Sequence, residues 1–451
     1  MKIPNYKLVH KIVVVCIFLG LTLSNCTQLP KDNKVKSNFN RASLIHNLND
    51  QLTESILHDG FSPPVASRIY AYSNIAAYEA VIGGSSEYQS LSGQLNDFKP
   101  NFPASSSEKY DYELAMVKAF CTVAKGLIYR DYIMDSVQNE LISEISSGKD
   151  EMVINASLRY GETIAKEIKL WISNDNYQET RSMPRFSVSK EPGKWVPTPP
   201  NYGEAIEPHW SKIRPFAMSS ASQLSDFPAT PFNSAEGSEF YNLALEVYEV
   251  VNSLSDKELE IARFWDCNPM VSVNHGHLMG VKRQLTPGGH WIGITRIATQ
   301  SAKFNLIKAC EAYTLVSIAL ADAFISSWDQ KFKSNLIRPE TYINEYIDRD
   351  WKPILETPLF PEHTSGHSVI SRAAATVLTE LLGDSYAFID STEVPFGLPP
   401  RPFKSFYDAS NEAAISRIYG GIHYEPARKL GIEQGALVGS WVMENVKTTN
   451  N

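Results

Sequence analysis

Apolar residues at helical spacing run through most of this chain and restrict its fold more than any other feature. They recur every three or four positions from about residue 41 to 175 and again from about residue 237 to 330. The clearest segments read "YDYELAMVKAFCTVAKGLIYRDYI", "SEFYNLALEVYEVVNSL" and "FNLIKACEAYTLVSIALADAFISSWDQ". This spacing gathers apolar side chains on one face of a helix, whereas runs typical of β-strands are short. With 451 residues, 43% of them hydrophobic, the chain can bury a large core. The sequence therefore predicts an all-α helical bundle with long ordered loops.

One segment interrupts the helical pattern. Nine prolines lie between Pro184 and Pro231, and a proline inside a helix lacks the amide donor and clashes with the preceding turn. This segment cannot be regular helix, so we expect it to wrap over the surface of the bundle. We predict a single helical domain over residues 41–447 that includes it.

The first 26 residues have the layout of a secretory signal. Three lysines precede an apolar run over residues 12–23, which is too short for a membrane span and ends close to Cys26. The letters "LSNC" resemble a bacterial lipoprotein signal, although Asn25 stands where Gly, Ala or Ser is usual. We predict a lipoprotein-type signal over residues 1–26 with lipidation at Cys26, simple cleavage nearby being the alternative, and a polar tether over residues 27–40. The mature protein would then be exported, as a periplasmic or cell-surface lipoprotein.

Charge and hydropathy argue against two kinds of partner. Removal of residues 1–25 takes away three lysines and no acid, so the formal net charge falls from −8 to −11. An acidic chain has no general attraction for nucleic acid. After the signal, no segment reaches the roughly 18 to 20 apolar residues of a membrane span, and the nearest, "YTLVSIALADAFI", is interrupted by Asp322. We expect no nucleic-acid partner and no membrane contact except through the lipid anchor.

The mature chain has an odd number of cysteines besides Cys26. Cys121, Cys267 and Cys310 show no metal-ligand spacing, so they allow at most one disulfide, whose pairing the sequence does not assign. Buried free thiols are the interpretation we favour.

The stretch "FPEHTSGHSVISRAAATVLTELLG" places small and polar residues at the start of an apolar helix. Apolar residues recur at helical spacing from His367 onward, so Ser365 and Gly366 lie in the first turn. There the backbone amides are unpaired and the helix dipole is positive, and glycine lets a ligand approach the main chain. The pattern indicates an anion site, with an ordinary serine N-cap as the simpler alternative.

Two flanking segments carry cations. In "KFKSNLIRPE", Lys331 and Arg338 are close to two helical turns apart, so both face one side if the helix continues to Pro339 and ends there. In "SRIYGGIHYEPA", Arg417 precedes His423 by six residues, and the two glycines between them permit a bend. Taken singly, these residues also fit solvated surface cations and a structural histidine.

In this order the three segments form a known motif set. Lys-x6-Arg-Pro, Ser-Gly-His and Ser-Arg-x5-His follow one another over residues 331–423. The set resembles that of the superfamily of type 2 phosphatidic acid phosphatases and vanadium-dependent haloperoxidases. The segments "WDQKFKSNLIRPETYI", "PGGHWIGIT", "GKWVPTPP" and "RPFAM" resemble the soluble bacterial haloperoxidases, above all the iodoperoxidases. The resemblance covers roughly residues 40–445, implies the helical haloperoxidase-like fold, and places the catalytic motifs within residues 328–427.

The resemblance also implies a role for each motif residue. The oxygens of a tetrahedral oxyanion would be bound by Lys331, Arg338, Ser365, the Gly366 amide and Arg417. His423 would bind the central atom, and His367 would be the acid–base group. With orthovanadate, vanadium(V), as cofactor, the substrates would be hydrogen peroxide and a halide, and the product hypohalous acid. With a phosphate ester, His423 would instead become phosphorylated, and the protein would be an exported acid phosphatase.

Details near the motifs favour the haloperoxidase. The phosphatase motif usually ends His-x3-Asp, but Ala427 stands at that position. This leaves open whether a backbone carbonyl or another carboxylate, such as Glu425, orients His423. Phe360 matches a position on the halide side of the haloperoxidase cavity, a core phenylalanine being the alternative.

Three more residues are candidates for the halide cavity. Trp328 and Asp329 lie within one turn of Lys331, and His363 replaces an aromatic residue that is common just before Ser-Gly-His. His363 on an exposed loop is the alternative. We expect iodide as the preferred halide, because it is the easiest to oxidise, and bromide next. An organic acceptor and a homodimer stay open.

Two alternative hypotheses would place this chain in other classes of protein. His275 and His277 in "NHGH", with His290 downstream, could form a divalent-metal site, because His-x-His can present two imidazoles together. No carboxylate partner is evident, and residues 274–276 are more typical of a turn. A non-enzymatic binding protein on the same scaffold is disfavoured because every charged motif residue is present.

Overall fold

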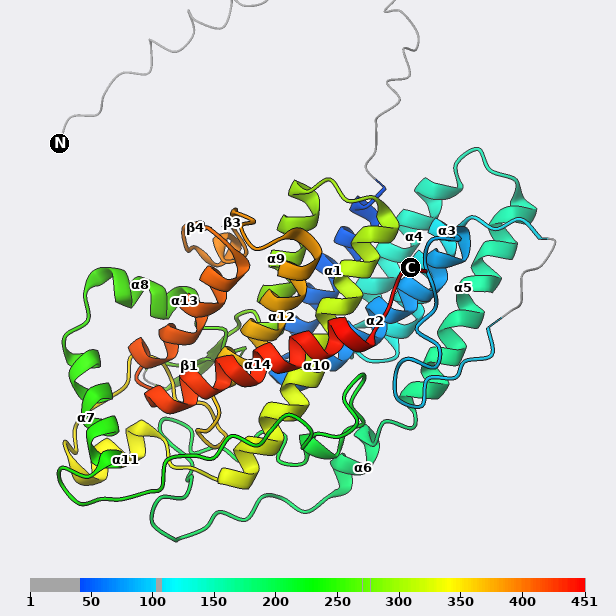
Figure 1. Ribbon diagram of the computed structural model, residues 1–451. Coiled ribbons are helices and arrows are strands. Elements are labelled where there is room, and N and C mark those ends of the chain that lie inside the picture. The colour runs from blue at the N-terminus through cyan, green and yellow to red at the C-terminus, as the bar shows by residue number, and fades with distance from the viewer. Residues whose placement is uncertain (1–40, 103–107, 270, 276, 451) are drawn as a thin grey trace, which may run out of the picture. The chain divides into compact units, whose positions relative to one another are not determined.

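Helices build most of the described part of the chain, as the apolar spacing predicts (Figure 1). The computed structural model describes residues 41–102, 108–269, 271–275 and 277–450. The predicted signal, the lipidation at Cys26 and the tether lie outside these residues. Cys121, Cys267 and Cys310 are buried free thiols, which confirms that interpretation.

The helices have the following bounds: α1 Ser43–Asp59, α2 Pro63–Val81, α3 Tyr112–Lys125, α4 Asp131–Ser146, α5 Glu151–Ile172, α6 Tyr177–Ser182, α7 Glu239–Asn252, α8 Asp256–Phe264, α9 Pro287–Ser301, α10 Leu306–Ser334, α11 Pro339–Tyr346, α12 Gly366–Leu382, α13 Phe406–Tyr419 and α14 Glu425–Asn445. Short 3-10 turns are η1 Ile82–Gly84, η2 Trp210–Lys212 and η3 Val394–Phe396. Two antiparallel pairs complete the described elements: β1 Val271–His275 with β2 Leu278–Lys282, and β3 Phe388–Asp390 with β4 Arg401–Phe403.

The long helix α10 is the centre of the bundle and packs against α2, α9, α12 and α14. Its length and hydropathy also suit a membrane crossing, which corrects the expectation that no segment after the signal reaches that limit. Its apolar window is completely buried by the protein itself, so it is a core helix.

Asp322 fastens the proline-rich segment to α10. Its carboxylate is fully buried and accepts hydrogen bonds from the backbone amides of Phe216, Ala217 and Met218 at 2.6, 2.8 and 2.9 Å. Burial raises the pKa of Asp322 to about 6, and the three amides oppose that rise. The acid that interrupts the apolar run therefore holds a loop in place.

Three glycines let α14 lie directly against α12. A Cβ at Gly435 would lie 2.1 Å from the carbonyl oxygen of Val369, and one at Gly431 would lie 3.0 Å from that of Ser365. Gly439 is equally confined one turn further on. Only a hydrogen atom fits at such distances, so these glycines set how closely the two helices approach. They thereby bring the N-terminal ends of α12 and α14 together.

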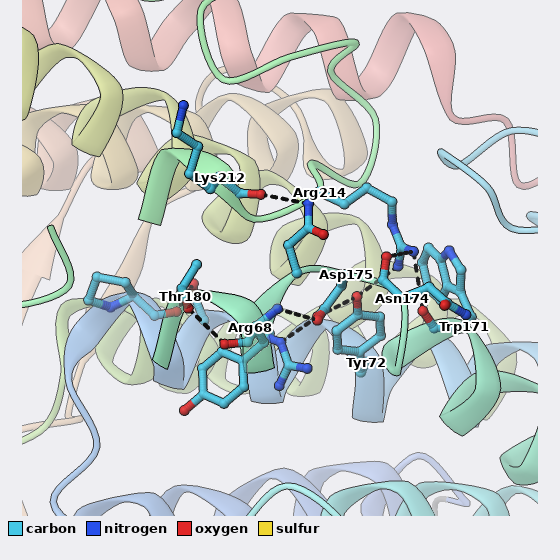
Figure 2. Close-up of polar contacts among 12 residues, drawn as sticks. Arg68, Tyr72, Trp171, Asn174, Asp175, Thr180, Lys212 and Arg214 are labelled. Atoms are coloured by element: carbon cyan, nitrogen blue, oxygen red, sulfur yellow. Dashed lines mark hydrogen bonds and ion pairs between the residues drawn. The ribbon is translucent and has the colours of Figure 1, made fainter. Parts of the chain in front are cut away.

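The proline-rich segment, residues 184–231, contains one 3-10 turn and no α-helix, as predicted (Figure 1). A buried polar network joins it to α2 and to the end of α5 (Figure 2). The Arg214 guanidinium donates to the Trp171 carbonyl at 3.2 Å and to the Tyr72 hydroxyl at 2.9 Å. Asp175 accepts from that hydroxyl at 3.0 Å and forms a buried ion pair with Arg68 at 2.5 Å. Buried hydrogen bonds and an ion pair thus tie a chain segment without regular structure to two helices.

The α12–α14 packing makes a prediction about stability. Gly435→Ala should lower the free energy of unfolding by roughly 2–3 kcal/mol, because the new methyl group overlaps the Val369 carbonyl. Gly126→Ala is the control, since its Cβ would lie no closer than 3.4 Å to another atom and its φ is an ordinary −74°. Urea unfolding of both variants would measure the difference, and equal small effects would contradict the packing described.

Candidate active site

The helix that carries Lys331 ends earlier than the sequence predicts. α10 stops at Ser334, and Asn335 caps it in the left-handed conformation with φ 47°. Arg338 is the N-cap of α11, and Pro339 begins that helix. The expectation of one helix up to Pro339 is therefore wrong, because the fixed φ of proline suits the first position of a new helix. The turn at Asn335, rather than a shared helical face, brings Arg338 back toward Lys331.

Lys331 is completely buried and holds the loop that precedes α12. Its ammonium donates to the backbone carbonyls of Pro361 at 3.1 Å, Glu362 at 3.0 Å and Thr364. These bonds use all three of its N–H groups. Burial lowers the pKa of Lys331 well below its usual range, and the charge of Arg338 adds to this while Glu362 opposes it. The Lys331 ammonium thus places positive charge next to the loop, but none of its N–H groups is left to donate to a ligand.

The start of α12 has the predicted position. Ser365 is its N-cap, and the Ser365 hydroxyl accepts from the Ser368 amide at 3.4 Å; the anion site at the same helix start stays a prediction. A Cβ at Gly366 would lie 3.7 Å from Lys331 Cε and 3.8 Å from the Trp328 ring. These are ordinary contacts, so the space beside the Gly366 backbone is open enough for a small ligand to approach the helix start.

His423 is buried and held in one tautomer by two neighbours. Its Nδ1 lies 2.7 Å from Oε1 of Glu362, an oxygen that also accepts from the Tyr424 amide at 3.0 Å. Its Nε2 lies 3.2 Å from Nη1 of Arg338, a group that can only donate. Nδ1 therefore carries the proton and Nε2 presents a lone pair. Burial lowers the pKa of His423 well below its usual range, and the charge of Arg338 adds to this, so the ring is the neutral form that binds metals.

Glu362 is the functional residue that the sequence reasoning missed. It is fully buried, and burial raises its pKa to about 7 although Arg338 and Lys331 oppose the rise. Glu425, the carboxylate considered from the sequence, instead pairs with Arg428. The available signal was the position of Glu362, five residues before His367 in the same motif stretch.

Arg417 and His367 meet at a single carbonyl group. Nη1 of Arg417 donates to the Trp265 carbonyl at 2.7 Å, and His367 also forms a hydrogen bond with the Trp265 backbone. Burial lowers the pKa of His367 well below its usual range, with Arg417 the next contribution. Between Arg417 and His423, Gly421 has φ 75°, so the chain bends at the glycine pair as predicted.

Three buried polar atoms at this site have no hydrogen-bond partner among the described residues. Nη2 of Arg338 and Nε of Arg417 are donors, whereas Nε2 of the neutral His367 ring is an acceptor. An unpaired buried donor costs about 1–3 kcal/mol, and more when it is charged. These donors and the excess of buried positive charge therefore fit a tetrahedral oxyanion such as vanadate or phosphate.

A cavity of about 810 Å³ reaches this cluster. Gly366, His367, Arg417 and His423 are among its lining residues. Much of the rest of the wall comes from the proline-rich segment, whose lining residues include Pro184, Phe186, Tyr202 and Pro208.

Trp328 and Phe360 also line this cavity. Their ring centroids are 4.8 Å apart. Lys331 Nζ and Arg338 Cζ each lie 5.1 Å from the Phe360 ring centroid, within reach of a cation–π interaction. Phe360 therefore combines an apolar wall with a contact to both cations.

Asp329 and His363 are not among the described lining residues, which corrects the expectation that they edge the cavity. Asp329 accepts from the Ser225 hydroxyl at 2.5 Å and pairs with Lys333. Nε2 of His363 lies 2.8 Å from the Phe227 carbonyl, and the side chain is buried rather than exposed on a loop. Both side chains contact the proline-rich segment, which the local sequence did not reveal.

Comparison with known proteins assigns the family. The family model described as "VCPO second helical-bundle domain" matches residues 311–451. A solved bacterial vanadium-dependent iodoperoxidase is 47% identical, over 91% of this chain and 98% of its own, with a TM-score of 0.86. The chain belongs to the vanadium-dependent haloperoxidase family.

More distant structures share the fold. The holo form of a bacterial vanadium-dependent chloroperoxidase is 16% identical with a TM-score of 0.62, and an apo form is 14% identical with a TM-score of 0.61. Each match covers 86% of this chain and 94% of the other. A search of curated protein sequences finds no match.

The contact between Glu362 and His423 makes a prediction about vanadate affinity. Glu362→Gln should weaken vanadate binding about tenfold or more, because a neutral partner makes the His423 lone pair less basic. Glu425→Gln is the matched control and should bind as the unchanged protein does. Equilibrium dialysis against vanadate would measure both, and equal affinities would remove Glu362 from the site.

The burial of His363 makes a prediction about acid stability. Burial lowers its pKa from 6.5 to about 4, against the effect of its bond to the Phe227 carbonyl. A group with a depressed folded-state pKa contributes stability above its unfolded pKa, and this is lost as pH falls from about 6.5 to about 4. His363→Gln should therefore flatten the decline of the free energy of unfolding over that range by roughly 2–3 kcal/mol. Urea unfolding at several pH values would test this, and an unchanged slope would contradict it.

Proposed function

We propose that this protein is a vanadium-dependent haloperoxidase that oxidises halide with hydrogen peroxide to hypohalous acid, using iodide in preference to bromide. The observation that carries the proposal is the lone pair on His423 Nε2, held by Glu362 among buried cations at the end of a cavity. Family membership supports the same conclusion, because the family is defined by dependence on vanadium. Bound vanadate would supply Lewis-acid activation of hydrogen peroxide toward attack by halide.

Different groups of this chain would bind different atoms of the vanadate. His423 would hold the vanadium through Nε2, and the free donors of Arg338 and Arg417 would hold its oxygens. The backbone of Gly366 would add the helix-terminal donor. His367 has a free Nε2 and neutral character, so it can accept a proton from peroxide and return it to the leaving oxygen.

The choice of iodide has two supports. The 47% identical structure is that of an iodoperoxidase. In addition, Trp328, Phe360 and Phe324 give the cavity aromatic walls, which suit a large, weakly hydrated anion better than a small, strongly hydrated one. An organic acceptor beyond the halide stays a prediction.

The phosphatase alternative is not favoured. Glu362 fills the orienting role of the aspartate that Ala427 replaces, so the departure at Ala427 alone does not exclude phosphoryl transfer. Membership of the haloperoxidase family is the stronger argument.

The direct test strips the protein of metal, restores orthovanadate, and supplies hydrogen peroxide with each halide beside a phosphate-ester assay. Vanadate-dependent halide oxidation supports the proposal, whereas ester hydrolysis that vanadate inhibits would make His423 a nucleophile.

We also propose export and lipidation at Cys26, which the layout of residues 1–26 supports. Mass spectrometry of the mature N-terminus would find an acylated Cys26, and an unmodified N-terminus would mean simple cleavage. The homodimer stays a prediction that light scattering would test.

Loss of the metal-binding group should abolish activity. His423→Ala removes the Nε2 lone pair and should eliminate vanadate-dependent halide oxidation while leaving the helical circular dichroism unchanged. Retention of full activity would reject the assignment of His423.

Loss of one anion-binding cation should act mainly on affinity. Arg338→Ala removes a charged donor and should weaken vanadate binding roughly 10- to 100-fold. Lys333→Ala is the control, because Lys333 is exposed and pairs with Asp329. Unchanged affinity in Arg338→Ala, measured by dialysis, would mean that Arg338 has only a structural role.

A further inference from the structure

A second cluster of buried ligand-type side chains lies outside the oxyanion site. Cys267 comes from the loop after α8, His290 from α9 and Glu393 from the residue that caps η3. Nδ1 of His290 lies 3.5 Å from Sγ of Cys267 and 3.2 Å from Oε1 of Glu393. All three ligand atoms lie within 4.8 Å of one another, and all three residues are buried.

These separations match those of a tetrahedral zinc site. Zinc binds cysteine sulfur at about 2.3 Å and histidine nitrogen or carboxylate oxygen at about 2.0–2.2 Å, so tetrahedral angles place neighbouring ligand atoms about 3.3–3.7 Å apart. The two distances measured from His290 Nδ1 are close to this range. A thiolate, an imidazole and a carboxylate together suit zinc better than magnesium or calcium, which prefer oxygen ligands.

The other side of the His290 ring is held as in known zinc sites. Its Nε2 lies 2.8 Å from Oδ2 of Asp390. The second oxygen of Asp390 accepts from the amide of Thr392 at 2.9 Å and from its hydroxyl at 2.7 Å. A histidine that binds a metal usually donates its second ring N–H to a carboxylate, which fixes the tautomer with Nδ1 toward the metal. The carboxylate partner that the sequence did not show for His290 is therefore present.

We propose that Cys267, His290 and Glu393 bind a zinc ion, with the fourth position facing the cavity that Cys267 lines. Of the histidines in the predicted three-histidine site, this cluster contains His290, whose partners here are Cys267 and Glu393 instead. The side chain of His275 lies outside the described residues. The simplest rival is a metal-free ion-pair network in which His290 donates to Asp390 and Glu393. In that arrangement the thiol of Cys267 is not needed.

The position of this zinc site gives it a structural role beside the oxyanion site. The Trp265 ring stacks on His290 with centroids 4.4 Å apart and an interplanar angle of 17°. The carbonyl of the same Trp265 accepts from Arg417 at 2.7 Å. A zinc ion that fixes His290 would therefore also fix the residue that positions Arg417. Zinc binding itself does not depend on the proposed peroxidase activity.

Titration of metal-free protein with cobalt(II) tests the proposal. Cobalt replaces zinc in tetrahedral sites, and a thiolate ligand gives it charge-transfer absorption in the near ultraviolet. We expect about one equivalent of cobalt to bind with this absorption and zinc to displace it. Cys267→Ser should abolish the absorption, whereas Cys310→Ser, which changes a buried thiol in α10 beside Met116, should keep it.

Two results would overturn the zinc site. The first is unchanged protein that binds no cobalt, or binds it without thiolate absorption, and this result needs no variant. The second is absorption that survives in Cys267→Ser. If that variant does not fold, Glu393→Gln keeps the thiolate and should weaken zinc binding at least tenfold in competition with a chromophoric chelator; unchanged affinity would likewise reject the site. Vanadate binding is measured on the same samples. If vanadate binds and cobalt does not, the zinc site is rejected while the oxyanion site stands.

Discussion

Burial of three cations around one histidine is the constraint on which the rest of this structure depends. Lys331, Arg338, Arg417 and His423 are all almost completely inaccessible, and a buried charge is stable only when polar groups replace the lost water. Backbone carbonyls accept hydrogen bonds from the Lys331 ammonium and from some of the N–H groups of Arg338 and Arg417. Within the described part of the chain, the carboxylate that contacts His423 is that of Glu362. The donors left over are those that an oxyanion would complete.

The fold keeps this arrangement rigid through contacts far from the charges. Close packing of α12 on α14 at Gly435 fixes the two helix starts, and Asp322 fastens a loop to α10. The network of Arg214, Tyr72 and Asp175 holds the proline-rich segment that walls the cavity (Figure 2). Because these contacts come from hydrogen bonds between buried groups and from close helix packing, the site is organised before any ligand arrives.

The sequence predicted the features that depend on local chemistry. The helical spacing of apolar residues predicted the helical bundle, and the proline content predicted that residues 184–231 contain no regular helix. The Ser365–Gly366 pair predicted where α12 begins. The motif spacing brought Arg338, His367, Arg417 and His423 into one site.

The missed features depend on contacts between distant segments. Glu362 binds His423 across 61 residues, and Trp265 binds Arg417 across 152 residues. Asp329 and His363 turn toward the proline-rich segment, whose path no periodic pattern describes. The end of α10 at Asn335 was missed for a different reason: Pro339 fits both the end of one helix and the beginning of the next.

The central claim is that the Nε2 lone pair of His423 and the free donors of two arginines form a single vanadate site. A crystal structure of the vanadate-loaded protein, with anomalous diffraction at the vanadium edge, tests this most directly. The account predicts one vanadium in contact with His423 Nε2, with oxygens bound by Arg338 and Arg417. Vanadium bound elsewhere, or a His423 ring that contacts the metal through Nδ1 and has left Glu362, would contradict it.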